Sequence, residues 1–263
     1  MLTGWKVNFP VEGRYFETEN GILYHGEAIT VMSKFPGSIF DAIITDPPYG
    51  TTACKWDNVI PFDDMWRELK RIRKDRTPIV LFGSEPFSSM LRVSNLQEYK
   101  YDWIWNKKKS GNPFLSKIQP VKITENIIVF GKSKINYYPI MEKRDKPKRR
   151  GKNKGKISET TNNVFIDDKV YYFKYPKNII EISNANQRNK HHPTQKPIAL
   201  LEYLVKTYTN EGGLVLDFTC GSGTTLVACK KLNRRWVGIE LEGKYCEIAK
   251  SRMLEAKNGS NTG

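Results

Sequence analysis

The sequence predicts a doubly wound α/β fold around a mostly parallel sheet. Short, continuous apolar runs, typical of strands buried on both faces, alternate with segments whose apolar residues recur at helical spacing. Residues 214–240 have the pattern of a buried strand, a glycine-rich turn, a helix and a second buried strand. A chain of 263 residues can form one large domain of this kind with an inserted module.

The individual elements follow from the same patterns. We expect strands at 41–45, 78–82, 101–105, 126–130, 214–217 and 236–240, and helices at 62–72, 85–93, 200–208 and from about 224 to 232. The helix at 62–72 is predicted by an apolar stripe with acidic residues in its first turn; the stripe consists of Phe62, Met65, Trp66, Leu69 and Ile72. The glycine turn comes late in the chain, so the two halves of the fold are permuted relative to the common order.

The first candidate site is Asp46-Pro47-Pro48-Tyr49, directly after the apolar run 41–45. Ligands of open α/β sheets bind outside the carboxyl ends of strands. The prolines donate no hydrogen bonds, which leaves preceding carbonyl oxygens available to an NH2 group such as the exocyclic amine of a nucleobase. Asp46 is a second acceptor, and Tyr49 offers a ring on which a base stacks. The alternative is a strand followed by an ordinary proline-rich turn without a function.

The second candidate site is the glycine turn after residue 217. Gly221 and Gly223 permit close approach of a ligand to the backbone, but the pattern lacks a complete G-x-G-x-x-G and a G-K-[ST]. Asp217 would repel a pyrophosphate and attract an ammonium, while Glu240 ends the next strand, where a ribose diol is held in nucleotide-type sites. S-adenosylmethionine carries an amino-acid ammonium, a ribose and an adenine.

Taken together, these segments resemble the DNA amino-methyltransferases in which the D-P-P-Y box precedes the F-x-G-x-G box. His192-Pro-Thr-Gln-Lys-Pro197 and Tyr24-His-Gly-Glu27 are similar to two further family segments, although the family usually has Asp at the position of Glu27. The likeness covers about residues 22–130 and 191–255. It implies a Rossmann-like fold of the S-adenosylmethionine-dependent methyltransferase type, with catalytic residues Asp46, Pro47, Pro48 and Tyr49. The implied cofactor residues are Asp217, Phe218, Thr219, Cys220, Gly221, Ser222, Gly223, Thr224, Glu240, Thr194, Lys196 and Asp46.

The region between the two similar segments is basic. We expect a catalytic half at 1–130, a target-recognition insertion at 131–190 and a cofactor-binding half at 191–263. Residues 143–156 are predicted to form a mobile, phosphate-contacting loop, whereas Asn and Gln near 178–189 suit base edges. Residues expected to contact DNA are Lys107, Lys108, Lys143, Lys148, Arg149, Arg150, Asn186, Gln187 and Arg188. The alternative for the insertion is a solvated basic segment that does not contact DNA. The alternative for residues 107–109 is a run of surface charges without a function.

Composition agrees with a polyanionic partner. The chain has 43 Lys and Arg against 28 Asp and Glu, which gives a net charge of +15. No long apolar segment or signal peptide is recognised, so no membrane association is expected. The four cysteines show no C-x-x-C spacing, so we expect reduced thiols, a cytoplasmic, nucleoid-associated protein and no metal site. A homodimer and a cognate restriction endonuclease are additional partners to test.

The function implied by the resemblance is site-specific methylation of the N6 amine of adenine in double-stranded DNA, after the base is flipped out of the helix. Methylation of cytosine N4 is the nearest alternative, but that group commonly has Ser in place of Asp46. Methylation of a protein amide is associated with Asn at that position and an early glycine box. An inactive DNA-binding protein on the same fold is the third alternative.

Overall fold

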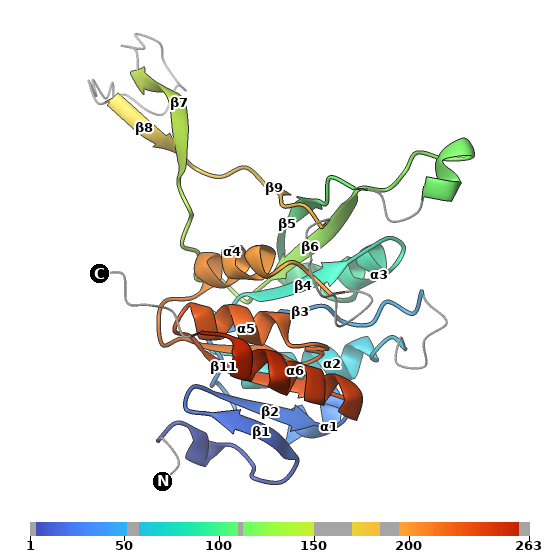
Figure 1. The fold of residues 1–263 in the computed structure, drawn as a ribbon, viewed down its shortest axis with the longest axis vertical. Helices are drawn as coiled ribbons and strands as arrows, with labels where there is room; N and C mark the ends of the chain where they lie inside the picture. Colours follow the sequence, from blue (N-terminus) through green and yellow to red (C-terminus); the bar gives the residue numbers. More distant parts are fainter. Residues whose placement is uncertain (1–3, 52–57, 110–112, 150–169, 185–194, 258–263) are drawn as a thin grey trace. The chain divides into compact units, whose positions relative to one another are not determined.

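The computed structural model describes residues 4–51, 58–109, 113–149, 170–184 and 195–257. Its main feature is a nine-stranded sheet in the order β1-β2-β11-β10-β3-β4-β6-β5-β9 (Figure 1). The strands are β1 (Arg14–Thr18), β2 (Gly21–His25), β3 (Ala42–Thr45), β4 (Ile79–Gly83), β5 (Tyr99–Asn106), β6 (Thr124–Phe130), β9 (Ile179–Glu181), β10 (Leu214–Asp217) and β11 (Arg235–Glu240).

The centre of this sheet is parallel. Strands β2, β11, β10, β3 and β4 pair in parallel, whereas β1 joins β2, and β6 joins β4 and β5, in antiparallel fashion. The carboxyl ends of β11, β10 and β3 therefore meet as neighbours at one edge. Segments that follow β3 and β10, far apart in sequence, are brought together there.

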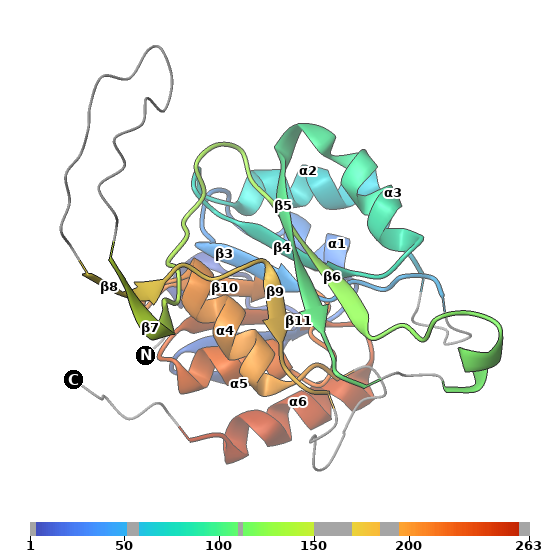
Figure 2. The same ribbon diagram turned by 90° about the horizontal axis from the view of Figure 1, so that it is seen from above.

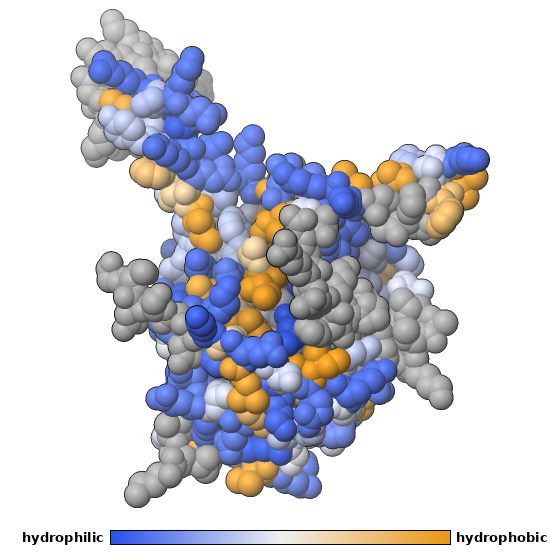
Figure 3. Space-filling model, viewed as in Figure 1, coloured by the Kyte–Doolittle hydropathy of each residue, from blue (hydrophilic) through white to orange (hydrophobic). Residues whose placement is uncertain are grey.

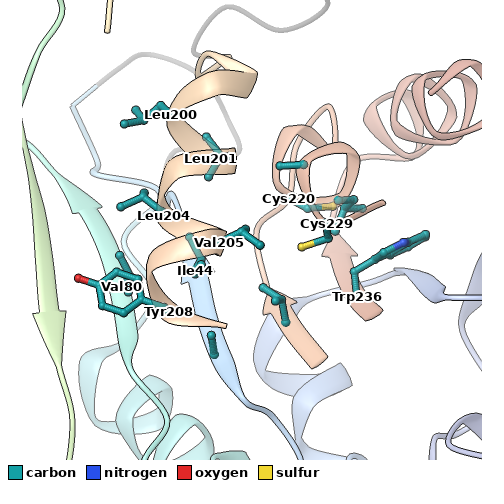
Figure 4. Close-up of a cluster of buried hydrophobic side chains, with 14 of the residues drawn as sticks. Ile44, Val80, Leu200, Leu201, Leu204, Val205, Tyr208, Cys220, Cys229 and Trp236 are labelled. Atoms are coloured by element: carbon teal, nitrogen blue, oxygen red, sulfur yellow. The ribbon is translucent and has the colours of Figure 1, made fainter. Parts of the chain in front are cut away.

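Helices cover both faces of the sheet (Figure 2). One face carries α1 (Ala28–Ser33), α2 (Phe62–Ile72) and α3 (Phe87–Ser94), and the other carries α4 (Ile198–Tyr208), α5 (Thr224–Lys231) and α6 (Gly243–Glu255). Successive strand residues point to opposite faces, so Ile43 packs with the first set of helices and Ile44 with the second. Figure 4 shows α4 directing Leu204 and Val205 toward this second core.

The doubly wound, mostly parallel architecture predicted from the sequence is confirmed. The predicted strands and helices occur, with small shifts at their ends; α3, for example, begins at Phe87 rather than residue 85. The sequence patterns gave no prediction for α1, α6, β1, β2 or β9. Strand β9 lies in the expected insertion but pairs in parallel with β5 of the main sheet, with Ile180 opposite Trp105.

The chain separates into two compact units, Met1–Tyr138 with Asn178–Gly263, and Pro139–Lys177. The smaller unit contains β7 (Glu142–Arg149) paired antiparallel with β8 (Val170–Lys174). The predicted loop at 143–156 is therefore wrong for 143–149, while 150–156 lie outside the described residues. The physical reason is cross-strand pairing, because the long stem of Lys143 lies opposite Phe173 and Lys148 lies opposite Tyr171.

Candidate active site

A cavity of about 540 Å³ lies at the carboxyl edge of the central strands. It is lined from one side by the residues that follow β3 and from the other by the turn after β10 and the end of β11. Lining residues include Asp46, Pro47, Pro48, Tyr49, Asp217, Phe218, Thr219, Cys220, Gly221, Ser222, Thr224 and Glu240. The two boxes singled out in the sequence thus face one shared space.

The D-P-P-Y turn is held in place by its own aromatic ring and by the glycine turn. The Tyr49 hydroxyl donates to Oδ1 of Asp46 at 2.5 Å, and the Tyr49 ring stacks on Phe87 with centroids 5.0 Å apart. The Thr219 hydroxyl donates to the main-chain carbonyl of Asp46 at 3.1 Å. These contacts hold both the carboxylate and the ring in place.

A series of ion pairs, which we call the charge chain, extends from Asp46 into the protein. The Lys196 ammonium lies 2.8 Å from Oδ2 of Asp46 and 3.1 Å from Oε2 of Glu125, whose other oxygen lies 3.0 Å from Lys107. The Lys196, Asp46 and Glu125 side chains are 11%, 25% and 15% exposed. Two carboxylates and two ammonium groups alternate, so the cluster is neutral when all four are ionised.

Burial and pairing act in opposite directions on these groups. Burial raises the pKa of Asp46, although the Lys196 ammonium partly opposes this effect. For Glu125, burial is outweighed by Lys196 and Lys107, and the pKa is lowered. Although burial disfavours its charge, the two carboxylates raise the pKa of Lys196, so it remains an ammonium. The rings of Phe82 and Trp105 also interact with this ammonium, because their centroids lie 5.1 and 6.0 Å from Nζ.

On the opposite side of the cavity, Asp217 is buried at the end of β10. Its Oδ1 accepts from the Thr45 hydroxyl at 2.6 Å and from the Thr219 amide at 3.3 Å. Burial raises the pKa of Asp217 to about 6, despite these stabilising hydrogen bonds. A cation bound beside it would stabilise the ionised form and lower that pKa.

The glycine turn is tied to the end of β11 by Glu240. Its two carboxylate oxygens accept from the amides of Gly221 and Glu242, each at 2.8 Å, and burial raises its pKa. Gly221 and Gly223 have φ values of 52° and 75°. A Cβ on Gly223 would approach the Cβ of Ala249 to 2.9 Å, so this glycine allows α6 to pack against α5.

The predicted site residues have different locations. Gly223 does not line the cavity, whereas Lys196 does and forms an ion pair with Asp46. Lys107 pairs with Glu125, while Lys108 is exposed and lies 3.6 Å from Glu181. Lys143, Lys148 and Arg149 belong to β7 and are exposed. Thr194, Arg150, Asn186, Gln187 and Arg188 lie outside the described residues.

Several lining residues were missed by sequence reasoning. Glu125 lies at the start of β6, which runs antiparallel to β4, so a rule about the carboxyl ends of parallel strands does not identify it. Trp105 lies near the carboxyl end of β5, on the far side of β6 from β4. Gln195 accepts a hydrogen bond from the Ser222 hydroxyl at 3.3 Å, which links the segment before α4 to the glycine turn. The sequence gives one indication of Glu125, which is that an acidic side chain directly precedes the predicted strand 126–130.

Other chemistry is limited in the described part of the chain. Cys220, Cys229 and Cys246 are buried free thiols, and burial raises the pKa of Cys220 well above its usual value. A nucleophilic thiolate is therefore disfavoured at this position, although Cys220 lines the cavity.

Among the described residues, no group of three or more His, Cys, Asp or Glu side chains is arranged to hold a metal ion. No helix within those ranges is long and apolar enough to cross a membrane.

A family model described as DNA methylase matches residues 40–251, which is most of the chain. The protein therefore belongs to the N6/N4 DNA methylase family. It is 30% identical over 247 residues to the type II methyltransferase M.HpaI of Haemophilus parainfluenzae, covering 88% of this chain and 74% of the relative. Identity to M2.DpnII of Streptococcus pneumoniae is 28% over 273 residues, with 94% of each chain covered.

Solved structures show the same fold. The M1.HpyAVI–SAM complex has a TM-score of 0.62 and 27% identity, and the match covers 88% of this chain and 98% of that one. The cytosine-N4-specific PvuII DNA methyltransferase has a TM-score of 0.68 over 96% and 91% of the chains. Its identity is only 17%, so this second likeness concerns the fold alone.

Proposed function

We propose that this protein transfers a methyl group from S-adenosylmethionine to the N6 amine of adenine in double-stranded DNA. The observation that carries the proposal is the single cavity shared by Asp46, Tyr49 and the glycine turn after Asp217. Direct transfer requires that the residues that hold the target amine face the residues that hold the cofactor. Here both sets line one cavity of about 540 Å³.

The cofactor fits the chemistry of the residues on its side of the cavity. Asp217 offers a carboxylate to the amino-acid ammonium, and Glu240 offers acceptor capacity to the ribose diol in addition to its two backbone hydrogen bonds. When bound, S-adenosylmethionine supplies an electrophilic methyl group on a sulfonium. The backbone of Gly221 allows close approach because no side chain intervenes.

The target base is proposed to enter from the side of Asp46. Tyr49 stacks on the flipped base while Phe87 supports the other face of the Tyr49 ring. Asp46 accepts a hydrogen bond from the exocyclic amine, and a carbonyl oxygen of the proline turn accepts the second. These bonds favour a pyramidal nitrogen whose lone pair can face the methyl group. Placement and electrostatics then supply most of the rate.

Lys196 is proposed to position Asp46 and keep it ionised. Its ammonium lies 2.8 Å from Oδ2, whereas the Tyr49 hydroxyl donates to Oδ1. Glu125 offers the ammonium a second carboxylate, so Lys196 can share Asp46 with an incoming amine without becoming an unpaired buried cation. After transfer the methylated nitrogen must lose a proton, and Asp46 or water accepts it. The raised pKa of Asp46, caused by burial, suits that role.

Adenine is favoured over cytosine because Asp heads the catalytic box, where the cytosine-specific group commonly has Ser. Methylation of cytosine N4 needs the same geometry and is the second candidate. Its supporting observation is membership of a family that includes both N6 and N4 methylases. A protein that binds DNA without catalysis is the third, but the connected contacts of Asp46, Tyr49 and Lys196 favour an active site.

The proposal extends to the organisation of the chain and to its partners. We propose a catalytic half, an inserted DNA-contacting unit that contains β7 and β8, and a cofactor-binding half. The exposed lysines and Arg149 of β7 would contact phosphates, and the type II relatives suggest a cognate endonuclease. A homodimer and a cytoplasmic, nucleoid-associated location belong to the same proposal.

The test uses the purified full-length protein, S-adenosylmethionine labelled on the methyl group, and unmethylated duplex DNA. After digestion to deoxynucleosides, the label should appear in N6-methyldeoxyadenosine. Label found only in N4-methyldeoxycytidine would support the second candidate. Absence of label, with DNA binding retained, would support the inactive alternative. Asp46→Asn is the matched control, because it preserves the size of the side chain but removes its charge.

A further inference from the structure

The connection between β5 and β6, residues 107–123, carries apolar side chains where solvent would favour polar ones. We call its described residues, 107–109 and 113–123, the β5–β6 arm. Its described residues include a short 3-10 helix, η3 (Pro113–Lys117), which stands away from the sheet in green in Figures 1 and 2. Phe114 is 90% exposed and Ile118 is 78% exposed, and Val121 and Ile123 are also exposed. Folding of this unit does not require two such residues at the surface.

The arm starts and ends at the mouth of the cavity. Strand β6 runs antiparallel to β4, so its first residues lie beside Gly83 at the carboxyl end of β4. Strand β5 ends at the same edge, with Asn106 opposite Thr124. Trp105 and Glu125, one residue inside each strand, both line the cavity. A molecule that enters the cavity from this edge therefore passes the root of the arm.

The charge of the arm indicates the kind of partner it contacts. Between residues 107 and 123 there are five lysines and no acidic residue; the lysines are Lys107, Lys108, Lys109, Lys117 and Lys122. Although Lys107 pairs with Glu125, Lys108, Lys109, Lys117 and Lys122 are exposed. A second copy of the same arm would be repelled by this charge, whereas a polyanion would be attracted. In Figure 3, hydrophilic and apolar surfaces occur together on this projection.

We propose that the β5–β6 arm contacts the DNA duplex and that Phe114 enters the base stack at the position left by the flipped base. The inference rests on the proposed function, because it assumes that the cavity takes a base from duplex DNA. Flipping leaves a gap between neighbouring base pairs, and an apolar side chain that fills it offsets part of the unstacking cost. Ile118 packs beside it against the sugars, and the arm's lysines neutralise flanking phosphates.

The test compares paired and unpaired targets. The full-length protein and its Phe114→Ala variant methylate two duplexes that contain the mapped target site, one fully paired and one with a mismatch opposite the target base. Mismatch removes much of the cost of flipping. We expect Phe114→Ala to slow methylation of the paired duplex by about ten- to a hundredfold, and of the mismatched duplex by less than about threefold. Phe114→Leu should recover most of the rate on the paired duplex.

Leu254→Ala is the matched control, because Leu254 is also exposed but lies at the far end of α6, away from the cavity edge. It should leave both rates unchanged. Equal losses on the two duplexes, or an unchanged rate on the paired duplex, would overturn the proposal that Phe114 enters the base stack, while leaving the proposed function intact. A wild-type protein that methylates no DNA would overturn the proposed function itself. If Phe114→Ala instead turned a dimer into a monomer with equal losses on both duplexes, the arm would be an interface between copies.

Discussion

Replacing Lys196 with methionine tests the proposal that the Lys196 ammonium keeps the Asp46 carboxylate ionised. Methionine preserves an unbranched stem beside the Phe82 and Trp105 rings but removes the ammonium. The change leaves Asp46 and Glu125 without the cation that lies 2.8 and 3.1 Å from them. Both carboxylates are mostly buried, so water compensates for little of the loss.

The expected magnitude follows from these interactions. Removing one partner from a buried ion pair typically costs about 3–5 kcal/mol. Asp46 is a quarter exposed, and Lys107 remains 3.0 Å from Glu125, so we expect a loss near the lower end, about 3 kcal/mol. Urea unfolding measures this free energy. Lys108→Met is the control, because its exposed pair with Glu181 should contribute less than about 1 kcal/mol.

The variant should also change the pH dependence of methyl transfer. Without Lys196, the pKa of Asp46 rises further, because burial and the charge of Glu125 both then act in the same direction. A higher pKa means that Asp46 ionises only at higher pH, so activity is lost first at low pH and recovers as pH increases. We expect the acidic limb of the rate profile to move up by at least about one unit.

The double variant Lys196→Met/Glu125→Gln should recover part of the stability and move the acidic limb back, because it removes the second negative charge from the same space. Rates measured between about pH 6 and about pH 9 make the comparison. If Lys196→Met lost less than about 1 kcal/mol and kept the wild-type acidic limb, the charge chain would not control Asp46.

Further variants separate the remaining roles. Asp46→Ala should abolish turnover but leave cofactor binding measurable by calorimetry; complete loss of binding would contradict its role at the target amine. Glu240→Ala should raise the cofactor Kd by about ten- to a hundredfold, because it removes charge-assisted hydrogen bonds of about 1.5–3 kcal/mol, and unchanged affinity would contradict the assignment. The pKa of Asp217 is about 6, and only the ionised form attracts the ammonium, so the cofactor Kd should rise about tenfold per unit as pH falls below that value and stay level in Asp217→Asn. Neutralising Lys148 and Arg149 together should weaken binding to all DNA sequences and flatten the salt dependence by up to about 0.9 for each phosphate that is no longer neutralised, whereas an altered recognition sequence would mean that they read bases.

The central strands and the two boxes could be predicted from sequence because they depend on local patterns. A continuous apolar run followed by Asp46, or by Asp217, predicts a buried strand with a carboxylate at its end without any distant contact. The late glycine turn predicted the permuted order of the two halves. Their meeting point follows from parallel pairing of β10 with β3.

The parts that could not be predicted depend on pairing between distant segments. Glu125 belongs to the site because β6 runs antiparallel to β4, and Lys196 reaches Asp46 across 150 positions of the chain. The run of charges in β7 was interpreted as a loop, because strand signals are weak when lysine and arginine replace β-branched residues. Its structure comes from the cross-strand partner β8, which sequence periodicity alone did not supply.

The most direct test of the central claim is a map of modified bases in the genome of a methylation-free host that expresses this protein. The proposal predicts N6-methyladenine at one defined sequence, and no modification at that sequence when the host expresses Asp46→Ala at the same level. N4-methylcytosine in place of N6-methyladenine would contradict the assignment of the base. A mark that persists in Asp46→Ala would contradict the role of the D-P-P-Y carboxylate in the transfer.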